Sequence, residues 1–331
     1  MKITISRQTA LQVASHTCLF TALVAAPLLS QAQNYPAKLV RIIVPQSAGG
    51  STDFAARALA QKLTETFKEN FLVDNRPGAG SINGTEAVAK ALPDGHTLLA
   101  VAASFTINPS LHKNLPFDPI RDFAPVTQLA GLPHLLVLHP SMPVKSVKEL
   151  ITVARSKPGE INYASSGVAT STHLAAELFM YLTKTRMVNV PYKGGAPAMV
   201  AMLSGECQVN FATISTGMPH ARSGKLRGIA VTSARRSIAA PEYPTIAESG
   251  VAGYEHNSWV GLLAPAKTPQ PIINRLNAEA AKIVQSSEVK QLLLREGLES
   301  SGNSTTDFER IIATEVAKWQ KLTKAAGINP Q

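Results

Sequence analysis

The sequence predicts an α/β protein built of two doubly wound lobes. Segments with the composition of strands and of helices alternate through most of the chain, which is typical of parallel sheets covered by helices on both faces. About 300 residues follow an N-terminal leader, a length at which chains usually divide into two domains. Two loops of similar composition, 47–53 and 165–171, each follow a predicted strand and precede a predicted helix. Ligands bind at such loops, so two facing lobes would enclose a cleft.

The first 32 residues have the pattern of a secretory signal peptide. Lys2 and Arg7 form a basic start, and residues 18–29 form an apolar run. Small residues up to Ala32 suit a signal peptidase, so we expect cleavage after Ala32 and export of the rest. The alternative, a membrane anchor, needs about 20 consecutive apolar residues, and this run is shorter.

Charge and cysteine content exclude several classes of protein. Cleavage would remove Lys2, Arg7 and Cys18, lowering the net charge from +10 to +8 and leaving Cys207 as the one cysteine. A single cysteine cannot form an internal disulfide, and we expect Cys207 to be a buried small residue. The basic residues are scattered and aromatic residues are few, which argues against a nucleic-acid groove. A small acidic ligand is the more natural partner.

The first unit of the exported chain is a strand, a glycine turn and a helix. Residues 39–44 are apolar and β-branched, and Gly49 and Gly50 allow a tight turn. A helix is predicted from Ser51, with apolar residues at every fourth position. The N–H groups at its start would converge on one point and attract an anion. The alternative is a turn whose glycines serve tight packing alone.

The later elements follow the same signals in order. Short apolar runs bounded by Gly, Pro and Asp predict strands, and runs with one apolar face between a capping residue and a glycine or proline predict helices. Strands are expected over 70–73, 96–102, a short segment ending at 129, 135–138, 162–164, 188–192, 209–213, 226–232 and 259–265. Helices are expected over 82–92, 146–156, 172–182, 196–203, 271–285, 287–296 and 305–325.

The candidate binding residues are small or polar and lie in loops that follow strands. Hydroxyl and backbone N–H groups hold carboxylates by hydrogen bonds, often through water. Singly, each Ser or Thr could equally be a helix cap, and Asp53 could interact with its own helix N-terminus. The candidates are Gln46, Ser47, Ala48, Gly49, Gly50, Ser51, Asp53, Ser104, Ser165, Ser166, Thr170 and Thr213, with His173 beside the second loop.

Catalytic patterns are missing from the sequence. No serine stands in a Gly-x-Ser-x-Gly elbow, and the eight histidines form no zinc-binding pattern. Phosphate-binding and dinucleotide-binding glycine motifs are also missing. We therefore expect no catalytic residue, no metal and no cofactor. The rival prediction, an exported enzyme acting on a carboxylate or ester, would need Ser165 or Ser166 with His173.

The chain resembles the periplasmic solute-binding proteins of tripartite tricarboxylate transporters, also called the Bug family. The resemblance extends in order over nearly all of the exported chain. The matching motifs are 41–45 (RIIVP), 48–53 (AGGSTD), 77–80 (PGAG), 93–95 (PDG), 116–119 (PFDP), 163–167 (YASSG), 190–194 (VPYKG), 244–250 (PTIAESG) and 261–265 (GLLAP).

This resemblance implies a type II Venus-flytrap fold in which crossing strands join two lobes. The lobes would comprise 33–130 with 256–331, and 131–255. It implies a periplasmic monomer that captures a small carboxylate and delivers it to the membrane subunits of the transporter. The first loop, with the neighbourhood of Gly95, would hold one carboxylate, and residues 165–170 would close from the second lobe. A sensor that signals to a membrane kinase is the alternative.

The sequence departs from the family pattern at two places. Gln46 and Ser47 replace an aromatic residue and a proline, and His96 replaces a tyrosine. These changes leave the fold expectation intact but alter the expected ligand. Ala103 and Ser104 are small, so we expect room for a bulky aromatic carboxylate such as terephthalate as well as for aliphatic di- and tricarboxylates.

Overall fold

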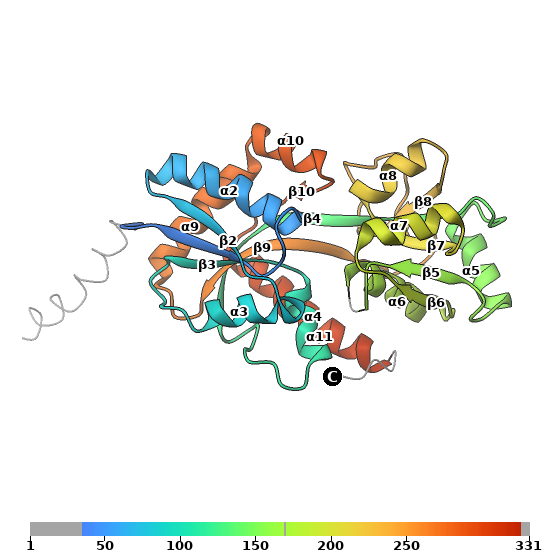
Figure 1. Ribbon diagram of the computed structural model, residues 1–331, viewed down its shortest axis with the longest axis horizontal. Coiled ribbons are helices and arrows are strands. Elements are labelled where there is room, and N and C mark those ends of the chain that lie inside the picture. Colours follow the sequence, from blue (N-terminus) through green and yellow to red (C-terminus); the bar gives the residue numbers. More distant parts are fainter. Residues whose placement is uncertain (1–34, 169, 326–331) are drawn as a thin grey trace, which may run out of the picture.

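The computed structural model describes residues 35–168 and 170–325, so the predicted signal peptide lies outside the described residues. The described chain forms two lobes joined by two long strands, β4 (Phe123–Leu138) and β9 (Asn257–Pro265) (Figure 1). The predicted fold class, two α/β lobes with crossing strands, is confirmed. The predicted lobe boundaries stay predictions; residue 130 lies within β4, and residue 255 lies just before β9.

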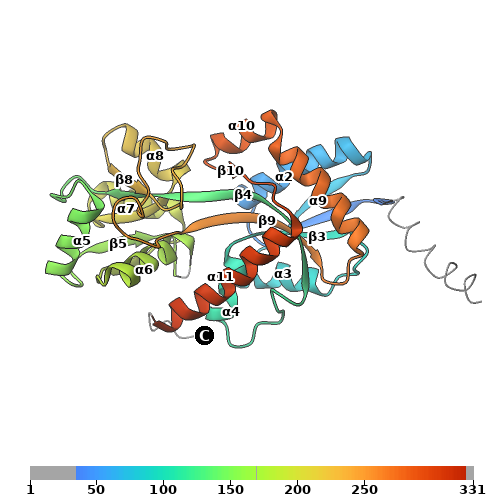
Figure 2. The ribbon, with the colours of Figure 1, turned by 180° about the vertical axis from the view of Figure 1, so that it is seen from behind.

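The first lobe is built from the two ends of the described chain. Its N-terminal elements are β1 (Val40–Val44), α2 (Ser51–Phe67), β2 (Phe71–Asn75), a 3₁₀ turn η1 (Ala79–Ser81), α3 (Ile82–Ala89), β3 (Thr97–Ala102) and α4 (Ser104–Leu111). Its C-terminal elements are α9 (Gln270–Gln285), α10 (Ser287–Arg295), β10 (Glu299–Ser300) and α11 (Thr305–Ala325). Seen from behind, α11 runs along this lobe beside α4 (Figure 2).

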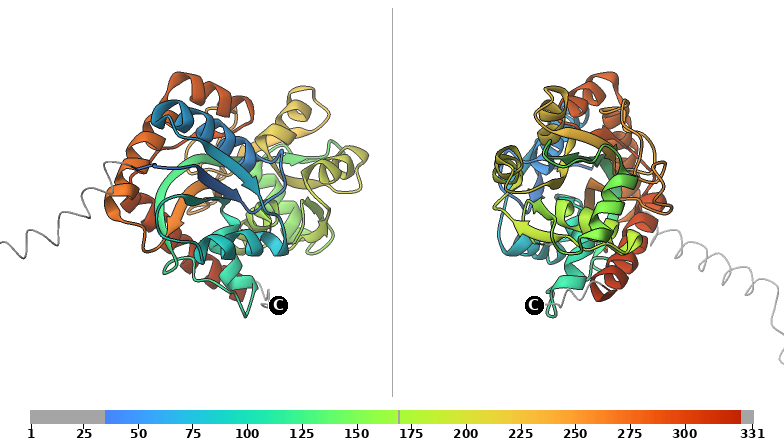
Figure 3. Two further views of the ribbon diagram at one scale, coloured as in Figure 1. Left: turned by 60° about the vertical axis from the view of Figure 1, so that its left-hand side comes forward. Right: turned by 90° about the vertical axis from the view of Figure 1, so that its right-hand side faces the viewer.

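The second lobe comes from the middle of the chain. It contains α5 (Val147–Ser156), β5 (Asn162–Ser165), α6 (Ser171–Thr183), β6 (Val188–Pro191), α7 (Gly195–Ser204), β7 (Val209–Thr213), α8 (Ile214–Arg222) and β8 (Arg227–Val231). Alternate residues of β4 face its two helical layers. Leu136 packs in the cluster with α5 and α6, and Leu135 packs in the cluster with α7 and α8. Figure 3 shows the ribbon of this lobe, in green to yellow, in two further views.

The sheet is mixed rather than purely parallel. Its strand order is β2-β1-β3-β9-β4-β7-β5-β6, with β8 and β10 also paired to β4. The pairs β1–β2, β1–β3, β5–β6 and β5–β7 are parallel, as predicted. Strands β4 and β9 pair antiparallel with each other and with their lobe neighbours. The expectation of parallel sheets throughout was wrong at these two strands, because they run in opposite directions between the lobes.

The long strand β4 differs from the sequence prediction, which gave a short strand ending at 129 and a separate one over 135–138. Pro125 and Pro133 lie inside β4, and prolines ordinarily indicate the end of a strand. The strand continues past Pro125 because its register to β9 shifts there. Helices α4 and α8 were not predicted either, and each contains an internal proline, Pro109 and Pro219.

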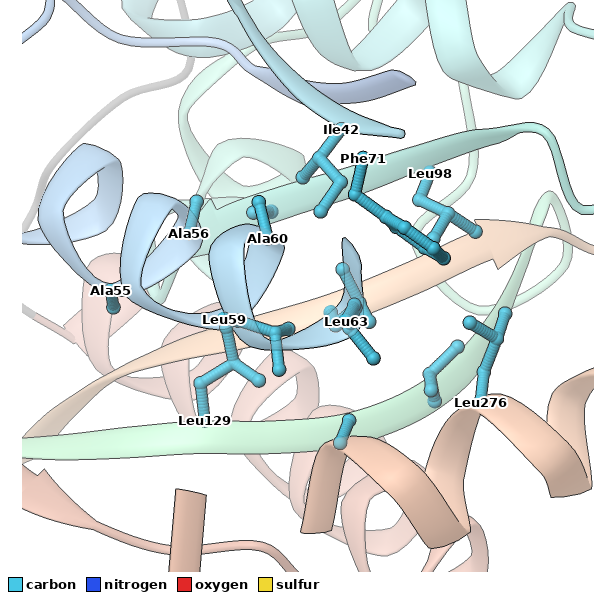
Figure 4. Close-up of a cluster of buried hydrophobic side chains, with 14 of the residues drawn as sticks. Ile42, Ala55, Ala56, Leu59, Ala60, Leu63, Phe71, Leu98, Leu129 and Leu276 are labelled. Atoms are coloured by element: carbon cyan, nitrogen blue, oxygen red, sulfur yellow. The ribbon is translucent and has the colours of Figure 1, made fainter. Parts of the chain in front are cut away.

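The core of the first lobe holds α2 against the sheet. Leu59 and Leu63 are fully buried and pack towards Ile42, Leu98 and Leu129 (Figure 4). Each buried leucine contributes roughly 1.5–3 kcal/mol relative to exposure, so this face positions the start of α2 firmly. In the second lobe Cys207 is buried and forms no disulfide, as expected. Over residues 35–168 and 170–325, no helix has the length and apolar character needed to cross a bilayer.

Candidate binding cleft

A cavity of about 870 Å³ opens between the two lobes. The first lobe contributes the glycine turn, one face of α2 and the end of α10. The second lobe contributes the starts of α6, α7 and α8 and part of β7. Because each wall comes from a different lobe, the volume of this cavity depends on how far the lobes close.

The glycine turn between β1 and α2 is held in place by Asp53. The Asp53 carboxylate is almost fully buried and accepts hydrogen bonds from the Gly49 N–H (2.9 Å), Arg57 Nε (3.1 Å) and Asn75 Nδ2 (3.0 Å). Burial raises the pKa of Asp53, but these hydrogen bonds outweigh burial and lower its pKa below the usual value. Asp53 is therefore ionised, and its negative charge is compensated by Arg57 and by the hydrogen bond from the Gly49 N–H.

The structure corrects the sequence prediction for the Gly49 N–H group. The Gly49 N–H was expected to be available to an anion, but it donates to Asp53. The N–H groups available to a ligand are those of the first turn of α2, which have no partner within the helix. Gly49 itself adopts a φ of +86°, which explains the glycine at this position.

A cluster of hydroxyl groups forms the facing wall in the second lobe. Thr172 Oγ1 accepts from the Ser166 N–H (2.8 Å) and lies 2.9 Å from Ser166 Oγ. Thr170 Oγ1 lies 3.1 Å from both of these hydroxyl oxygens and donates to the Gly167 carbonyl (2.7 Å). Ser166 and Thr172 line the cavity, and Thr170 contacts both of them without lining it.

Two further helix starts complete the second wall. Gly194 precedes α7 with a φ of +118°, and its N–H donates to the Ser166 carbonyl (3.2 Å), so the two loops are tied together. Gly195 and Ala196 of α7 line the cavity. Thr213 precedes α8, and its Oγ1 lies 2.8 Å from Thr216 Oγ1. The hydroxyl-bearing residues Ser166, Thr172, Thr213, Ser215 and Thr216 therefore line this side of the cavity together with three alanines, Ala196, Ala198 and Ala212.

The electrostatic character of the cavity follows from these four helices. The N-termini of α2, α6, α7 and α8 all contribute lining residues. Each N-terminus carries partial positive charge of about half an elementary charge. Among the described lining residues Arg57 is the one cation, and it is engaged with Asp53. The described residues contain no group of His, Cys, Asp and Glu side chains arranged to hold a metal. The arrangement suits an anion held by neutral donors.

The structure brings six of the predicted site residues to the cavity wall and leaves eight outside it. The six are Gly49, Gly50, Ser51, Asp53, Ser166 and Thr213. Gln46, Ser47 and Ala48 belong to the glycine turn without lining the cavity. Ser165 is fully buried, and neither it nor Thr170 lines the cavity. Ser104 begins α4, and its buried Oγ has no partner in the described part of the chain.

The expected roles of Gly95 and His96 are corrected by the sheet register. Thr97, the first residue of β3, pairs with Arg41 near the start of β1, so Gly95 and His96 lie at the amino edge. The glycine turn follows the opposite, carboxyl edge. Tyr35 donates to the Gly95 carbonyl (2.7 Å), and its ring packs edge-on against His96. These residues therefore pack in the first lobe at the edge of the sheet opposite the glycine turn, and they do not line the cavity.

His173 also turns away from the cavity. Its side chain is buried on the inner face of α6, with Nε2 3.5 Å from Glu177 Oε1 and its ring stacked on Tyr163. The structure therefore shows a packing role for this histidine. A Ser–His pair of the kind an enzyme would need is not formed with Ser165 or Ser166.

Several lining residues were missed by sequence reasoning. Gly195, Ala196, Ser215 and Thr216 follow strands β6 and β7, so the rule used for the two predicted loops would also have found them. Other lining residues carry no comparable signal because they come from helix faces, a strand interior or the distant C-terminal part of the chain: Phe54, Arg57, Ala58, Gln61, Thr172, Ala198, Asn210, Ala212, Leu292 and Glu296.

The chain is similar to known proteins both in sequence and in structure. Residues 55–328 match a family model described as the tripartite tricarboxylate transporter family receptor. The chain is 34% identical over 309 residues to protein BugT of Bordetella pertussis, covering 93% of this chain and 94% of BugT. Two solved structures from Rhodopseudomonas palustris are similar. Rpa4515 with adipate is 36% identical with a TM-score of 0.77 (90% of this chain, 100% of that chain). MatC with bound malate is 28% identical with a TM-score of 0.73 (87% and 99%).

Proposed function

The chain belongs to the family of tripartite tricarboxylate transporter receptors, and on this premise we propose that it captures a small carboxylate between its two lobes. Members of this family are binding receptors and not enzymes, which confirms the prediction that the chain has no catalytic function. The observation that supports the proposed ligand class most is the convergence of four helix N-termini on one cavity. Such termini favour an anion and need no metal or lysine.

The body of the ligand has room to vary. A volume of about 870 Å³ suits a small or drug-sized molecule. Two similar proteins carry adipate and malate in their solved structures, both small aliphatic carboxylates. The cavity volume also admits an aromatic carboxylate such as terephthalate. Thermal-shift screening of aliphatic and aromatic acids of equal charge would decide between these classes.

Delivery to a transporter completes the proposal. Exported to the periplasm after cleavage at Ala32, the protein would act as a monomer, and closure of its lobes on the ligand would create the surface that the membrane subunits recognise. Because only the closed, loaded form would present that surface, the subunits could distinguish it from the empty protein. Growth on the ligand should therefore require both this chain and the membrane subunits.

Calorimetric titration tests the binding site directly. We expect carboxylates to bind and their neutral amides of the same shape not to. Ala196→Glu places a negative charge at the start of α7 inside the cavity and should weaken carboxylate binding at least tenfold, since like charges repel strongly at a desolvated site. Val200→Glu is the matched control, because Val200 is exposed on the same helix and lies outside the cavity.

Two results would overturn the proposal. One is equal affinity for acids and amides in the native protein. The other is carboxylate binding that survives Ala196→Glu unchanged, which would place the ligand elsewhere on the molecule.

A further inference from the structure

We propose that Glu299 is a positioning residue for ligand binding, which joins the two lobes beside the crossing strand β4 and favours the arrangement in which the cavity is formed. This inference rests on the proposed function, because it concerns how the lobes are held around the ligand. Glu299 is not among the described residues that line the cavity, so it acts on affinity without touching the ligand.

Glu299 lies where segments of both lobes attach to β4. It belongs to β10 of the first lobe, which pairs antiparallel with β4 so that Glu299 is opposite Gly131. A few residues further along β4, the His134 N–H donates to Thr232 Oγ1 (2.8 Å), and the Thr232 N–H donates to the His134 carbonyl (2.9 Å). Thr232 follows β8 of the second lobe. The chain after β8 and strand β10 are therefore held close together although they belong to different lobes.

The Glu299 carboxylate makes the contact between these two segments. Its Oε1 accepts hydrogen bonds from the Ser237 hydroxyl and from the Ile238 N–H (3.0 Å). Ser237 is 1% exposed, and its Oγ also accepts from the Ala239 N–H (3.1 Å), so both donors belong to one hydrogen-bonded turn of the second lobe. Hydrogen bonds to an ionised carboxylate are about twice as strong as those between neutral groups.

The chain that leads into β10 also packs against the wall of the ligand cavity. A Cβ placed on Gly297 would lie 3.1 Å from the Ser215 backbone nitrogen and 3.3 Å from Ile214 Cβ, so this chain lies directly against the start of α8. Ser215 lines both the ligand cavity and a second cavity of about 680 Å³ between α8 and α10 (Figure 1). The Glu299 contact therefore helps to set the distance between the two walls.

The energetic consequence follows from the position of the ligand between the lobes. A ligand that touches both walls binds only when the walls are close, so its apparent affinity scales with the fraction of molecules in that arrangement. A hydrogen bond between the lobes that forms in the close arrangement raises this fraction before the ligand arrives. The Glu299 contact thus removes part of the free-energy cost of binding.

Titration of the native protein and of Glu299→Ala with adipate, malate and terephthalate tests the inference. The acid that binds the native protein most tightly should bind Glu299→Ala about fivefold more weakly, because a charge-assisted bond between the lobes is lost. Glu299→Gln keeps an acceptor for both donors and should recover part of this loss. Without ligand, Glu299→Ala should show a larger radius of gyration than the native protein in small-angle X-ray scattering.

Glu248→Ala is the matched control, because Glu248 makes the same kinds of bond within the second lobe. Its Oε2 accepts from the Thr245 N–H (2.9 Å) and from Arg236 Nε (3.1 Å). This variant should lose stability in urea but keep the native affinity and the native ligand-free radius. A loss of affinity in Glu248→Ala equal to that in Glu299→Ala would show that general destabilisation is the cause, and it would overturn the inference.

Ser237→Ala tests the same contact from the second lobe. It should weaken binding in the same direction, and combined with Glu299→Ala it should add little, because the two residues share one interaction. Should Glu299→Ala not fold, Ser237→Ala and Glu299→Gln carry the test. Native affinity in the variants overturns the inference while carboxylate binding stands. If the native protein binds none of the three acids, the proposed function is wrong, and the ligand-free radius then decides this inference: equal radii for native and variant overturn it.

Discussion

Asp53 shows how one buried side chain can hold the glycine turn in place. Its three hydrogen bonds join the turn, α2 and β2. Asp53→Ala should lower the free energy of unfolding by about 2 kcal/mol, because Arg57 and the Gly49 N–H lose their common partner. Urea denaturation measures this loss. Asp53→Asn, which keeps one acceptor, should lose less, and an unchanged urea midpoint for Asp53→Ala would contradict this role.

Gly84 sets the distance between α3 and the strand that leads into the turn. A Cβ at Gly84 would lie 2.8 Å from the Arg76 carbonyl oxygen and from Pro45 Cβ. Because the first of these atoms is backbone, Gly84→Ala should cost about 1–3 kcal/mol of stability through overpacking.

Gly195→Ala is the matched control for that substitution. Its new Cβ would meet only Thr216 Cγ2 at the ordinary distance of 3.8 Å. Thermal unfolding of the two variants side by side should show a clear loss of Tm for Gly84→Ala alone. Equal Tm values would show that α3 yields without strain.

At the scale of elements, the joining strands carry a buried histidine pair. His134 on β4 and His256 just before β9 have ring centroids 5.4 Å apart, and both are almost fully buried. Burial lowers the pKa of His134 to about 4. Burial, then His134 and the ammonium of Lys318, also lower the pKa of His256, while its contact with Ser171 opposes this shift.

We expect this pair to make the junction between the lobes sensitive to acid. Both pKa values are lower in the folded state than in the unfolded state, so the unfolded state binds more protons below about pH 6.5. The contribution of this pair to the free energy of unfolding should be fully present above that pH. It should fall as the pH drops towards 4, with His134 alone accounting for roughly 3 kcal/mol.

Urea denaturation between pH 7.5 and pH 4.5 checks this expectation. His134→Leu, similar in size and without a titrating group, should flatten the dependence on pH. His112→Gln, at a half-buried position just after α4, should keep the dependence on pH. A native protein whose stability does not change over this range would show that the pair is not a source of acid sensitivity.

The elements also show where local patterns fail. Most strands and helices were predicted from apolar periodicity and capping residues, and Ser146 indeed accepts from the Glu149 N–H at the start of α5. The prediction was wrong at β4, α4 and α8 because each contains a proline, and a proline ordinarily indicates the end of a strand or helix. Pairing to β9 and packing in the core sustain these elements despite their prolines, and such support is not visible in a local pattern.

At the scale of the whole molecule, the cavity exists because the lobes face each other. Its walls come from α2 and α10 on one side and from α6, α7 and α8 on the other. A bound ligand that contacts both walls should favour the closed arrangement. We expect the radius of gyration, measured by small-angle X-ray scattering, to fall when a binding carboxylate is added to saturation.

The Ala196→Glu variant is the control for closure, since it should not compact when the same acid is added. Compaction of the variant, or an unchanged radius for the saturated native protein, would contradict a ligand-driven closure.

The amino-acid sequence by itself determined the α/β class and the two loops that follow strands, and it predicted that the helix starts at these loops suit an anion. These properties depend on neighbouring residues, because glycine angles, helix caps and apolar periodicity act over a few positions. It also carried the motifs by which the chain resembles its family.

Only the tertiary structure decided which residues meet across the cleft. It removed Gly95 and His173 from the site and brought in Asn210 and Glu296, which lie far apart in the sequence. The physical reason is that sheet register and lobe packing set which edge a residue occupies and what faces it. Register depends on pairing between segments that are distant in the sequence, such as Arg41 of β1 with Thr97 of β3.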